Sequence, residues 1–287
     1  MTLHDLPDEL IEGLDVRGAT RVTGGDIAQA YRLDTPTGPL FLKTMRTPPS
    51  GLFAREAAGL RELSAHAPAS LGVPDVRREC AQGLVLSWID EGGRRPQSTE
   101  ARFGRALARL HRTTRPQFGG LAGDGGGYLG SVPIDLTPCA DWPEFYLERR
   151  LRPLLTAAVS AGRVSPQATA LLDRLAPRVD DLCGPPEPPA LVHGDLWAGN
   201  RLVDTEGRSW LIDPAAHYAH REIDLAMMHL FAGFGAAVVA AYDEEYPLAA
   251  GWRERIAWYQ LPPLLVHAIL FGGGYGDSVL AALRRYV

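Results

Sequence analysis

One short segment, residues 191–214, constrains what this chain of 287 residues can fold into more than any other part of the sequence. It reads LVHGDLWAGNRLVDTEGRSWLIDP. Asp195 directly follows an apolar strand, Asn200 lies five residues later, and Asp213 lies eighteen residues after Asp195. A predicted hairpin, residues 201–213, separates Asn200 from Asp213. The pattern predicts a strand, a loop and a hairpin that together present three polar side chains.

These three side chains form a set that phosphoryl transfer from ATP requires. The attacking hydroxyl needs a carboxylate that orients it and accepts its proton, and the Mg²⁺ ion that bridges the ATP phosphates needs hard oxygen ligands. Asp195 suits the role of catalytic base, and Asn200 and Asp213 suit the role of metal ligands. Aspartate is also common in turns and helix caps. The matched positions at these spacings nevertheless favour a catalytic loop of the kinase type.

The loop departs from that of protein kinases at two points. Gly194 stands where the protein-kinase HRD motif has arginine, and Asp213-Pro214 stands where DFG is found. This combination resembles the aminoglycoside-phosphotransferase-like kinases, which phosphorylate small molecules, more closely than it resembles protein kinases.

A lysine and a glutamate far upstream complete the expected ATP site. Lys43 lies at the end of a predicted strand, and Glu56 lies on the next predicted helix, residues 52–65. In kinases such a lysine pairs with the α- and β-phosphates, and a glutamate holds its ammonium group in place. Taken alone, Lys43 and Glu56 would each be interpreted as an ordinary surface residue. Because the chain is poor in lysine and rich in arginine, however, a lysine on an apolar strand favours a specific role.

Two further ATP contacts are predicted from position along the chain. Gly24 and Gly25 form a turn two strands before Lys43, where backbone N–H groups could approach phosphate oxygens. Two glycines in a hairpin are also an ordinary turn. Ser87 and Ile89 lie where a hinge would contact adenine through its backbone.

The fold class predicted from these patterns is α+β. Short strands and one helix dominate residues 1–90, whereas helices dominate residues 91–287. We therefore expect an ATP-binding lobe built on an antiparallel sheet, a catalytic and substrate-binding lobe that is mainly helical, and a cleft between them. Residues 116–140 are rich in glycine and proline and predict a long irregular loop, a feature that is often functional.

Composition limits the binding partners and the cellular compartment that we expect for this protein. The formal net charge of −5 gives no support to a nucleic-acid or anionic-membrane partner. The three cysteines have long spacings that suit neither a disulfide framework nor a zinc site. The acidic start lacks the features of a signal peptide, and no apolar run is long enough to span a bilayer. We expect a cytoplasmic monomer with a small-molecule substrate.

Several motifs resemble those of the fructosamine kinase family, in the same order along most of the chain. They are GGDIAQAY (24–31), FLKT (41–44), EAAGLREL (56–63), LARLHR (107–112), DWPEFYLERRL (141–151), HGDLWAGN (193–200), IDPAAHYAHREIDLAM (212–227), FAGF (231–234) and WYQLPPLLVHAILFGGGYG (258–276). Members of this family have a kinase-like fold and use ATP to phosphorylate the 3-hydroxyl of ketosamines. Their substrates include ribulosamine, erythrulosamine and fructosamine adducts, free or on protein lysines. A phosphate beside the C2 carbonyl is a good leaving group, so its elimination frees the amine and reverses glycation.

The resemblance also suggests which residues meet the substrate. Trp197 could stack on the sugar or on its amine-bearing tail. His217 could line the cleft floor, and Glu222 could contact the substrate or belong to a buried network. Asp224 is expected to brace the catalytic loop by accepting backbone N–H groups. Residues 128–136 depart from the polar pattern of the family, which leaves the preferred sugar open.

Two alternatives remain at this point. The first is another small-molecule kinase that acts on an aminoglycoside, choline or a similar alcohol. An aminoglycoside site is usually lined by acidic residues, and the 116–140 loop offers few of them. The second is a kinase-like binding module without activity, against which the intact Lys43, Asp195, Asn200 and Asp213 argue.

Overall fold

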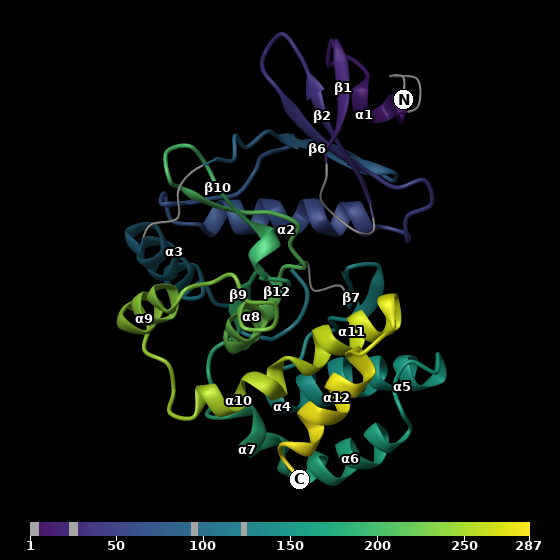
Figure 1. Cartoon of the computed structure of the whole chain (residues 1–287), viewed down its shortest axis with the longest axis vertical. Coiled ribbons are helices and arrows are strands. Elements are labelled where there is room, and N and C mark those ends of the chain that lie inside the picture. Colours follow the sequence, from purple (N-terminus) through teal and green to yellow (C-terminus); the bar gives the residue numbers. More distant parts are fainter. Residues whose placement is uncertain (1–5, 23–27, 93–96, 122–124) are drawn as a thin grey trace.

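The computed structural model describes residues 6–22, 28–92, 97–121 and 125–287. An antiparallel sheet forms the upper part of the molecule, and helices form most of the lower part (Figure 1). The strands of the sheet follow the spatial order β1 (Gly18–Val22), β2 (Gln29–Asp34), β3 (Leu40–Thr44), β6 (Gly83–Ser87) and β5 (Val76–Cys80). The short helix α1 (Asp8–Ile11) lies beside this sheet.

The long helix α2 (Leu52–His66) crosses the molecule between the sheet and the helical part (Figure 1). Its residues are mostly good helix formers, and its apolar side chains recur at helical spacing. Phe53, Leu60 and Leu63 of α2 belong to the same core as Leu84 and Leu86 of β6. Apolar packing therefore fixes helix α2 to the sheet, and the same core continues into the lower part at Phe103 and Tyr218.

The lower part contains most of the helices. They are α3 (Gln97–Leu110), α4 (Trp142–Glu144), a π-helical segment (Phe145–Leu151), α5 (Arg152–Ser160), α6 (Gln167–Leu175), α7 (Val179–Cys183), α8 (Glu222–Met228), α9 (Ala236–Glu245), α10 (Trp252–Tyr259), α11 (Leu261–Phe271) and α12 (Tyr275–Arg284). Short 3-10 turns occur at Ala176–Arg178 and Ala198–Asn200. Among the described residues, no helix combines the length and the apolar character needed to cross a bilayer.

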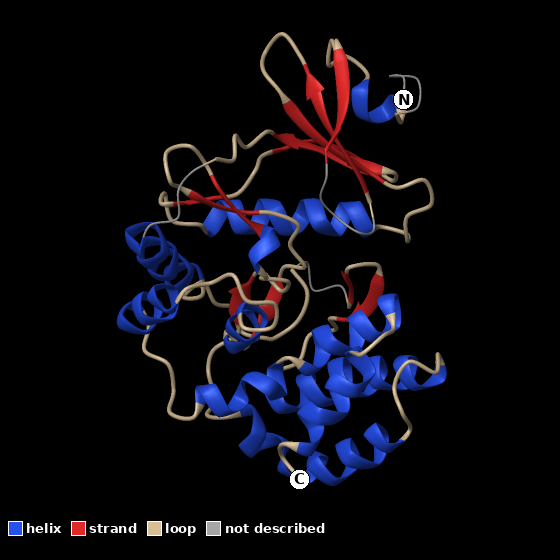
Figure 2. Cartoon of the chain, viewed as in Figure 1, coloured by secondary structure: helices blue, strands red, loops and turns tan. Residues whose placement is uncertain are grey.

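Three small sheets lie outside the large one, shown as red arrows in Figure 2. They consist of β9 (Ala190–Val192) with β12 (His217–Ala219), of β10 (Arg201–Val203) with β11 (Ser209–Leu211) and β4 (Leu71–Gly72), and of β7 (Gly126–Leu129) with β8 (Val132–Asp135). The first two sheets frame the predicted catalytic segment, since β9 leads into Asp195 and the β10–β11 hairpin separates Asn200 from Asp213.

The α+β class, the helix at residues 52–65 and the hairpin after Asn200 were all predicted correctly. The prediction of an irregular loop over residues 116–140 was wrong in part, because it contains the β7–β8 hairpin. Gly127 explains the miss. Glycine lowers the expectation of a strand, yet a Cβ atom at this position would lie 2.4 Å from Leu136 Cδ1, so glycine leaves room here for the Leu136 side chain.

Candidate active site

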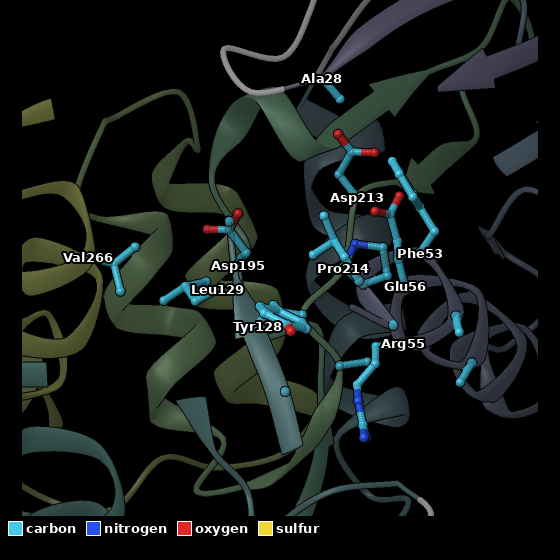
Figure 3. Close-up of a pocket in the computed structure, with 18 of the residues that line it drawn as sticks. Ala28, Phe53, Arg55, Glu56, Tyr128, Leu129, Asp195, Asp213, Pro214 and Val266 are labelled. Carbon is cyan, nitrogen blue, oxygen red and sulfur yellow. The ribbon is translucent and has the colours of Figure 1, made fainter. Parts of the chain in front are cut away.

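A cleft between the upper and lower parts collects most of the predicted catalytic side chains. Lys43 and Glu56 reach it from β3 and α2, whereas Asp195, Asn200 and Asp213 reach it from the catalytic segment. Figure 3 shows Asp195, Asp213 and Glu56 projecting among the side chains that line this cleft. Residues that are far apart in the sequence thus lie together, as the hypothesis of a kinase site requires.

The backbone before Asp195 is held by a buried carboxylate. The backbone N–H groups of His193 and Gly194 donate to Asp224, at 2.7 and 2.8 Å, so the predicted brace is confirmed. Gly194 has a φ of +82°, and a Cβ atom there would lie 2.2 Å from the carbonyl oxygen of Ala215. This close approach explains why glycine stands where protein kinases have arginine.

Asp195 is held by Asn200 and carries an unusual pKa. The amide Nδ2 of Asn200 donates to the carbonyl oxygen of Asp195 at 2.9 Å and to its Oδ2 at 3.2 Å. Burial, together with the nearby charges of Asp213 and Asp224, raises the pKa of Asp195 to about 7, although Asn200 and Lys43 act to lower it. A carboxylate with a pKa near neutrality is suited to accept a proton from a hydroxyl group.

Lys43 lies between two carboxylates. Its Nζ is 3.0 Å from both carboxylate oxygens of Glu56 and 3.1 Å from Oδ1 of Asp213. Burial lowers the pKa of Lys43, but the two carboxylates more than offset this effect and raise it above the ordinary value. Burial acts in the opposite direction on Glu56 and raises its pKa to about 7, although Lys43 lowers it. We take the ammonium of Lys43 to be charged, since it is the shared partner of both acids.

Lys43 is also the only lysine in the sequence. Every other basic side chain is an arginine or a histidine. The one side-chain ammonium group therefore lies where it contacts Glu56 and Asp213. A compact ammonium can approach phosphate oxygens as a point charge, whereas arginine would present a wider planar fork.

The donor set beside Lys43 is suited to a hard divalent cation. Asp213 offers a carboxylate on the cleft surface, and its backbone adopts the left-handed region with a φ of +53°. Because the Asn200 amide nitrogen is engaged with Asp195, its amide oxygen is the atom that remains for a metal. Asp195, Asp213 and Glu56 outnumber the one ammonium of Lys43, and a cation would compensate this negative charge.

Trp197 lies at the mouth of the cleft with its side chain 39% exposed. Its indole packs over Gly199, where a Cβ atom would lie 2.2 Å from the ring, and Phe231 meets it edge-on with the ring centroids 6.0 Å apart. An exposed indole beside the catalytic loop matches the predicted substrate contact, which remains a prediction.

The cleft lining does not include His217, which was predicted at the cleft floor, or Glu222, for which a substrate contact and a buried network were both left open. His217 lies on β12 beneath the cleft floor, fully buried, with Nδ1 donating to the Ala215 carbonyl oxygen at 2.8 Å. Glu222 is buried as well, and both of its carboxylate oxygens accept from Arg255, at 2.6 and 2.7 Å. Their places in the sequence near Asp213 did not reveal that the chain turns inward after Ala216.

The predicted hinge and phosphate loop are only partly described by the structure. Ser87 ends β6, where its Oγ accepts the backbone N–H of Asp75 at 2.9 Å. The carbonyl oxygen of Ile89 accepts the backbone N–H of Glu91 at 3.0 Å. Adenine contact by Ser87 and Ile89 stays a prediction, and Gly24 and Gly25 lie outside the described residues.

Other cleft residues were not singled out from the sequence. Tyr128 and Leu129 come from the β7–β8 hairpin, and Val266 and His267 come from α11. The only signal for the hairpin was the unusual length of the 116–140 loop. The α11 residues lie in a strongly apolar helix, whose sequence gives no sign of which side faces the cleft.

Comparisons with known proteins agree with this geometry. The sequence model of the fructosamine kinase family matches residues 3–287. A protein of Enterococcus faecium named "Probable ketoamine kinase" is 36% identical over 270 residues, which cover 92% of this chain and 94% of that protein. The chloroplastic protein-ribulosamine 3-kinase of Arabidopsis thaliana is 33% identical over 273 residues, which cover 93% and 81% of the two chains.

A solved structure shows the same similarity in three dimensions. The crystal structure of a Thermobifida fusca protein described as a "putative fructosamine-3-kinase" superposes with a TM-score of 0.87 at 39% identity. The match covers 97% of this chain and 96% of the other. The two-lobed kinase-like architecture predicted from the sequence is thereby confirmed.

Proposed function

This chain belongs to the fructosamine kinase family, and from that premise we propose how its cleft phosphorylates a ketosamine. The protein is a ketosamine 3-kinase, a phosphotransferase that acts on the adducts of a sugar and an amine. As a kinase it uses ATP. The observation that carries the proposal is the meeting of Lys43, Glu56 and Asp213 in one cleft with Asp195.

In the proposed reaction Asp195 binds the 3-hydroxyl of the ketosamine. Its carboxylate accepts the hydroxyl proton as the oxygen forms a bond to the γ-phosphorus, and the bond from that phosphorus to ADP breaks. Burial and the neighbouring carboxylates raise the pKa of Asp195 to about 7, which favours this transfer near neutral pH. The amide of Asn200 donates to the backbone carbonyl oxygen of Asp195 and to its carboxylate, and these two contacts hold the carboxylate in place.

Lys43 binds the α- and β-phosphates, and Glu56 keeps its ammonium group in position. Asp213 and the amide oxygen of Asn200 would hold Mg²⁺, which neutralises charge on the phosphates when bound. Gly24 and Gly25 are proposed to cover the phosphates, and the backbone at Ser87 and Ile89 to contact adenine.

The sugar and its amine-bearing tail are proposed to bind between the catalytic loop and the lower helices. Trp197 offers an exposed aromatic face there, and a secondary ammonium next to a ketose sugar could bind such a face by a cation–π contact. We propose that the substrate is a free ketosamine or a glycated lysine and that the enzyme acts as a monomer.

A coupled assay of ADP release tests the proposal. The protein is supplied with ATP, Mg²⁺ and either ribuloselysine, erythruloselysine, fructoselysine, kanamycin or choline. We expect turnover with one or more ketosamines and none with kanamycin or choline. Turnover restricted to kanamycin or choline would show that the assigned substrate class is wrong while leaving the kinase chemistry intact.

A further inference from the structure

A second acidic residue of α2 links this helix to the lower part of the molecule. Oε1 of Glu62 accepts the hydroxyl of Tyr218 at 2.8 Å and Nη2 of Arg115 at 2.9 Å. Tyr218 belongs to β12, and Arg115 follows α3, so both partners come from the side of the cleft opposite the large sheet. Glu62 does not line the cleft that holds Lys43 and Asp195.

The contact is the last of a series along one side of α2. Glu56, Gly59 and Glu62 are spaced three residues apart, a spacing that places them on successive turns of the helix. Glu56 shares Lys43 with Asp213. Helix α2 and residues 213–218 therefore run in the same direction, and successive turns of the helix contact successive residues of that segment.

The middle step of this series is a very close approach. A Cβ atom at Gly59 would lie 3.1 Å from Cβ of Ala216 and 3.5 Å from Cγ of Pro214. Glycine thus lets α2 lie directly against the backbone that follows Asp213, and Glu62 then closes the far end of the contact on Tyr218.

Tyr218 is a rigid anchor for Glu62. Its side chain is 1% exposed, and its backbone exchanges two hydrogen bonds of 2.9 Å with Gly119. Burial raises the pKa of Tyr218 to about 12, with the hydrogen bond to Glu62 adding to this shift, so its hydroxyl remains a donor. The guanidinium of Arg115 lies 4.6 Å from the centre of the tyrosine ring and also donates to the carbonyl oxygen of Leu121.

We propose that Glu62, Tyr218 and Arg115 form a positioning clamp that fixes α2 against residues 213–218 and so keeps Glu56 on Lys43 beside Asp213. The phosphate site is then assembled by the fold itself, without a separate event that swings the helix into place. For catalysis this inference rests on the proposed function, but the position of Glu56 can be measured without any turnover.

The single lysine of the chain provides that measurement. An amine acylating reagent such as acetic anhydride modifies Lys43 and the N-terminal amine, and the Lys43 peptide is quantified by mass spectrometry. Loss of a carboxylate partner increases the unprotonated fraction of an amine and therefore its rate of acylation. Glu56→Gln defines the rate expected when the glutamate no longer holds Lys43.

The test variants are Glu62→Ala and Tyr218→Phe, with Glu62→Gln as the conservative change. Glu79→Gln is the matched control. It weakens the 2.7 Å ion pair that Glu79 of β5 makes with Arg61 of α2, and it leaves the contacts of α2 with the lower part unchanged. In Glu62→Ala we expect Lys43 to be acylated about tenfold faster than in the wild type. The increase should be smaller in Tyr218→Phe, and Glu62→Gln should retain part of the protection of Lys43. The control should match the wild type.

The double variant Glu56→Gln/Glu62→Ala decides whether the clamp acts through Glu56. We expect Lys43 to be acylated no faster in the double variant than in Glu56→Gln alone. In the single variants, kcat/KM for ATP should fall as the acylation rate of Lys43 rises. Additive effects, or a Tyr218→Phe protein that is folded and acylates like the wild type, would overturn the proposal. If the wild type fails to turn over any ketosamine, the proposed function fails, whereas the acylation rates still test the clamp.

Discussion

The backbone N–H of Gly194 donates a 2.8 Å hydrogen bond to Oδ1 of Asp224, a residue thirty positions later in the sequence. Gly194 directly precedes Asp195, the proposed catalytic base. The other oxygen of Asp224 accepts the backbone N–H of His193 and lies 3.2 Å from Nε2 of His111. Asp224 is fully buried, and burial raises its pKa, but the hydrogen bonds and charges of His111 and His193 lower it below the ordinary value. A buried carboxylate with these partners fixes the path of the backbone into Asp195.

Replacing Asp224 tests this brace. Asp224→Ala leaves two buried N–H groups without an acceptor, and we expect it to lower the free energy of unfolding by about 3 kcal/mol. Asp224→Asn can still accept one of these hydrogen bonds and should cost less. Urea denaturation measures stability, and kcat of the folded fraction measures placement of Asp195. An unchanged kcat in folded Asp224→Asn would show that Asp195 is placed without the brace.

The assignment of the catalytic base is tested by Asp195→Asn. An amide cannot accept the hydroxyl proton, so we expect kcat to fall by about 10² to 10⁴. Binding of ATP, measured by calorimetry, should change little, because Lys43 and Glu56 are untouched. Asp75→Asn, which alters an exposed carboxylate, is the control. If Asp195→Asn kept more than a small part of the wild-type rate, another group would have to take the proton.

The residues predicted to be catalytic could be picked out of the sequence because most of them are local. Asp195, Asn200 and Asp213 lie within one short segment whose strands and turns fix their relative positions. Lys43 and Glu56 were found by position on a strand and on the next helix, and their pairing follows from the packing of α2 on the sheet.

The residues that were missed depend on contacts between distant segments. Glu62 meets Tyr218 across 156 residues, and nothing in the sequence near either residue indicates the partner. For Glu222 the sequence left a substrate contact and a buried network open, and in the structure its carboxylate is bound by Arg255 from α10. Such pairs are set by how the helices pack, which local patterns do not encode.

The role of Trp197 is tested both by displacing its indole and by removing it. Because the indole packs over Gly199, Gly199→Ala should displace it, since the new Cβ atom would lie 2.2 Å from the ring. We expect Gly199→Ala and Trp197→Ala each to raise KM for the ketosamine about tenfold, with KM for ATP nearly unchanged.

Trp197→Phe serves as the comparison, because it keeps an aromatic face and should retain much of the affinity. Equal KM values for the ketosamine in the wild type and in Trp197→Ala would mean that the indole only packs the catalytic loop. A rise in KM for ATP instead would show that Asn200 or Asp213 had moved.

Buried histidines predict how stability depends on pH. Burial lowers the pKa of His217 to about 3, with the charge of Arg150 adding to the shift, and burial also lowers the pKa of His193 and His220. In the unfolded chain a histidine takes up a proton below pH about 6.5. The folded state then binds fewer protons than the unfolded state, so the stability due to these neutral side chains is present above that pH and lost as the pH falls.

For His217 the loss should continue until the pH approaches the folded pKa of about 3. One proton corresponds to about 1.4 kcal/mol of unfolding free energy per pH unit. We therefore expect His217→Gln to reduce the slope of unfolding free energy against pH by about that amount between pH about 6 and 4.5. Equal slopes in His217→Gln and the wild type would mean that His217 takes up its proton in the folded protein as readily as in the unfolded chain.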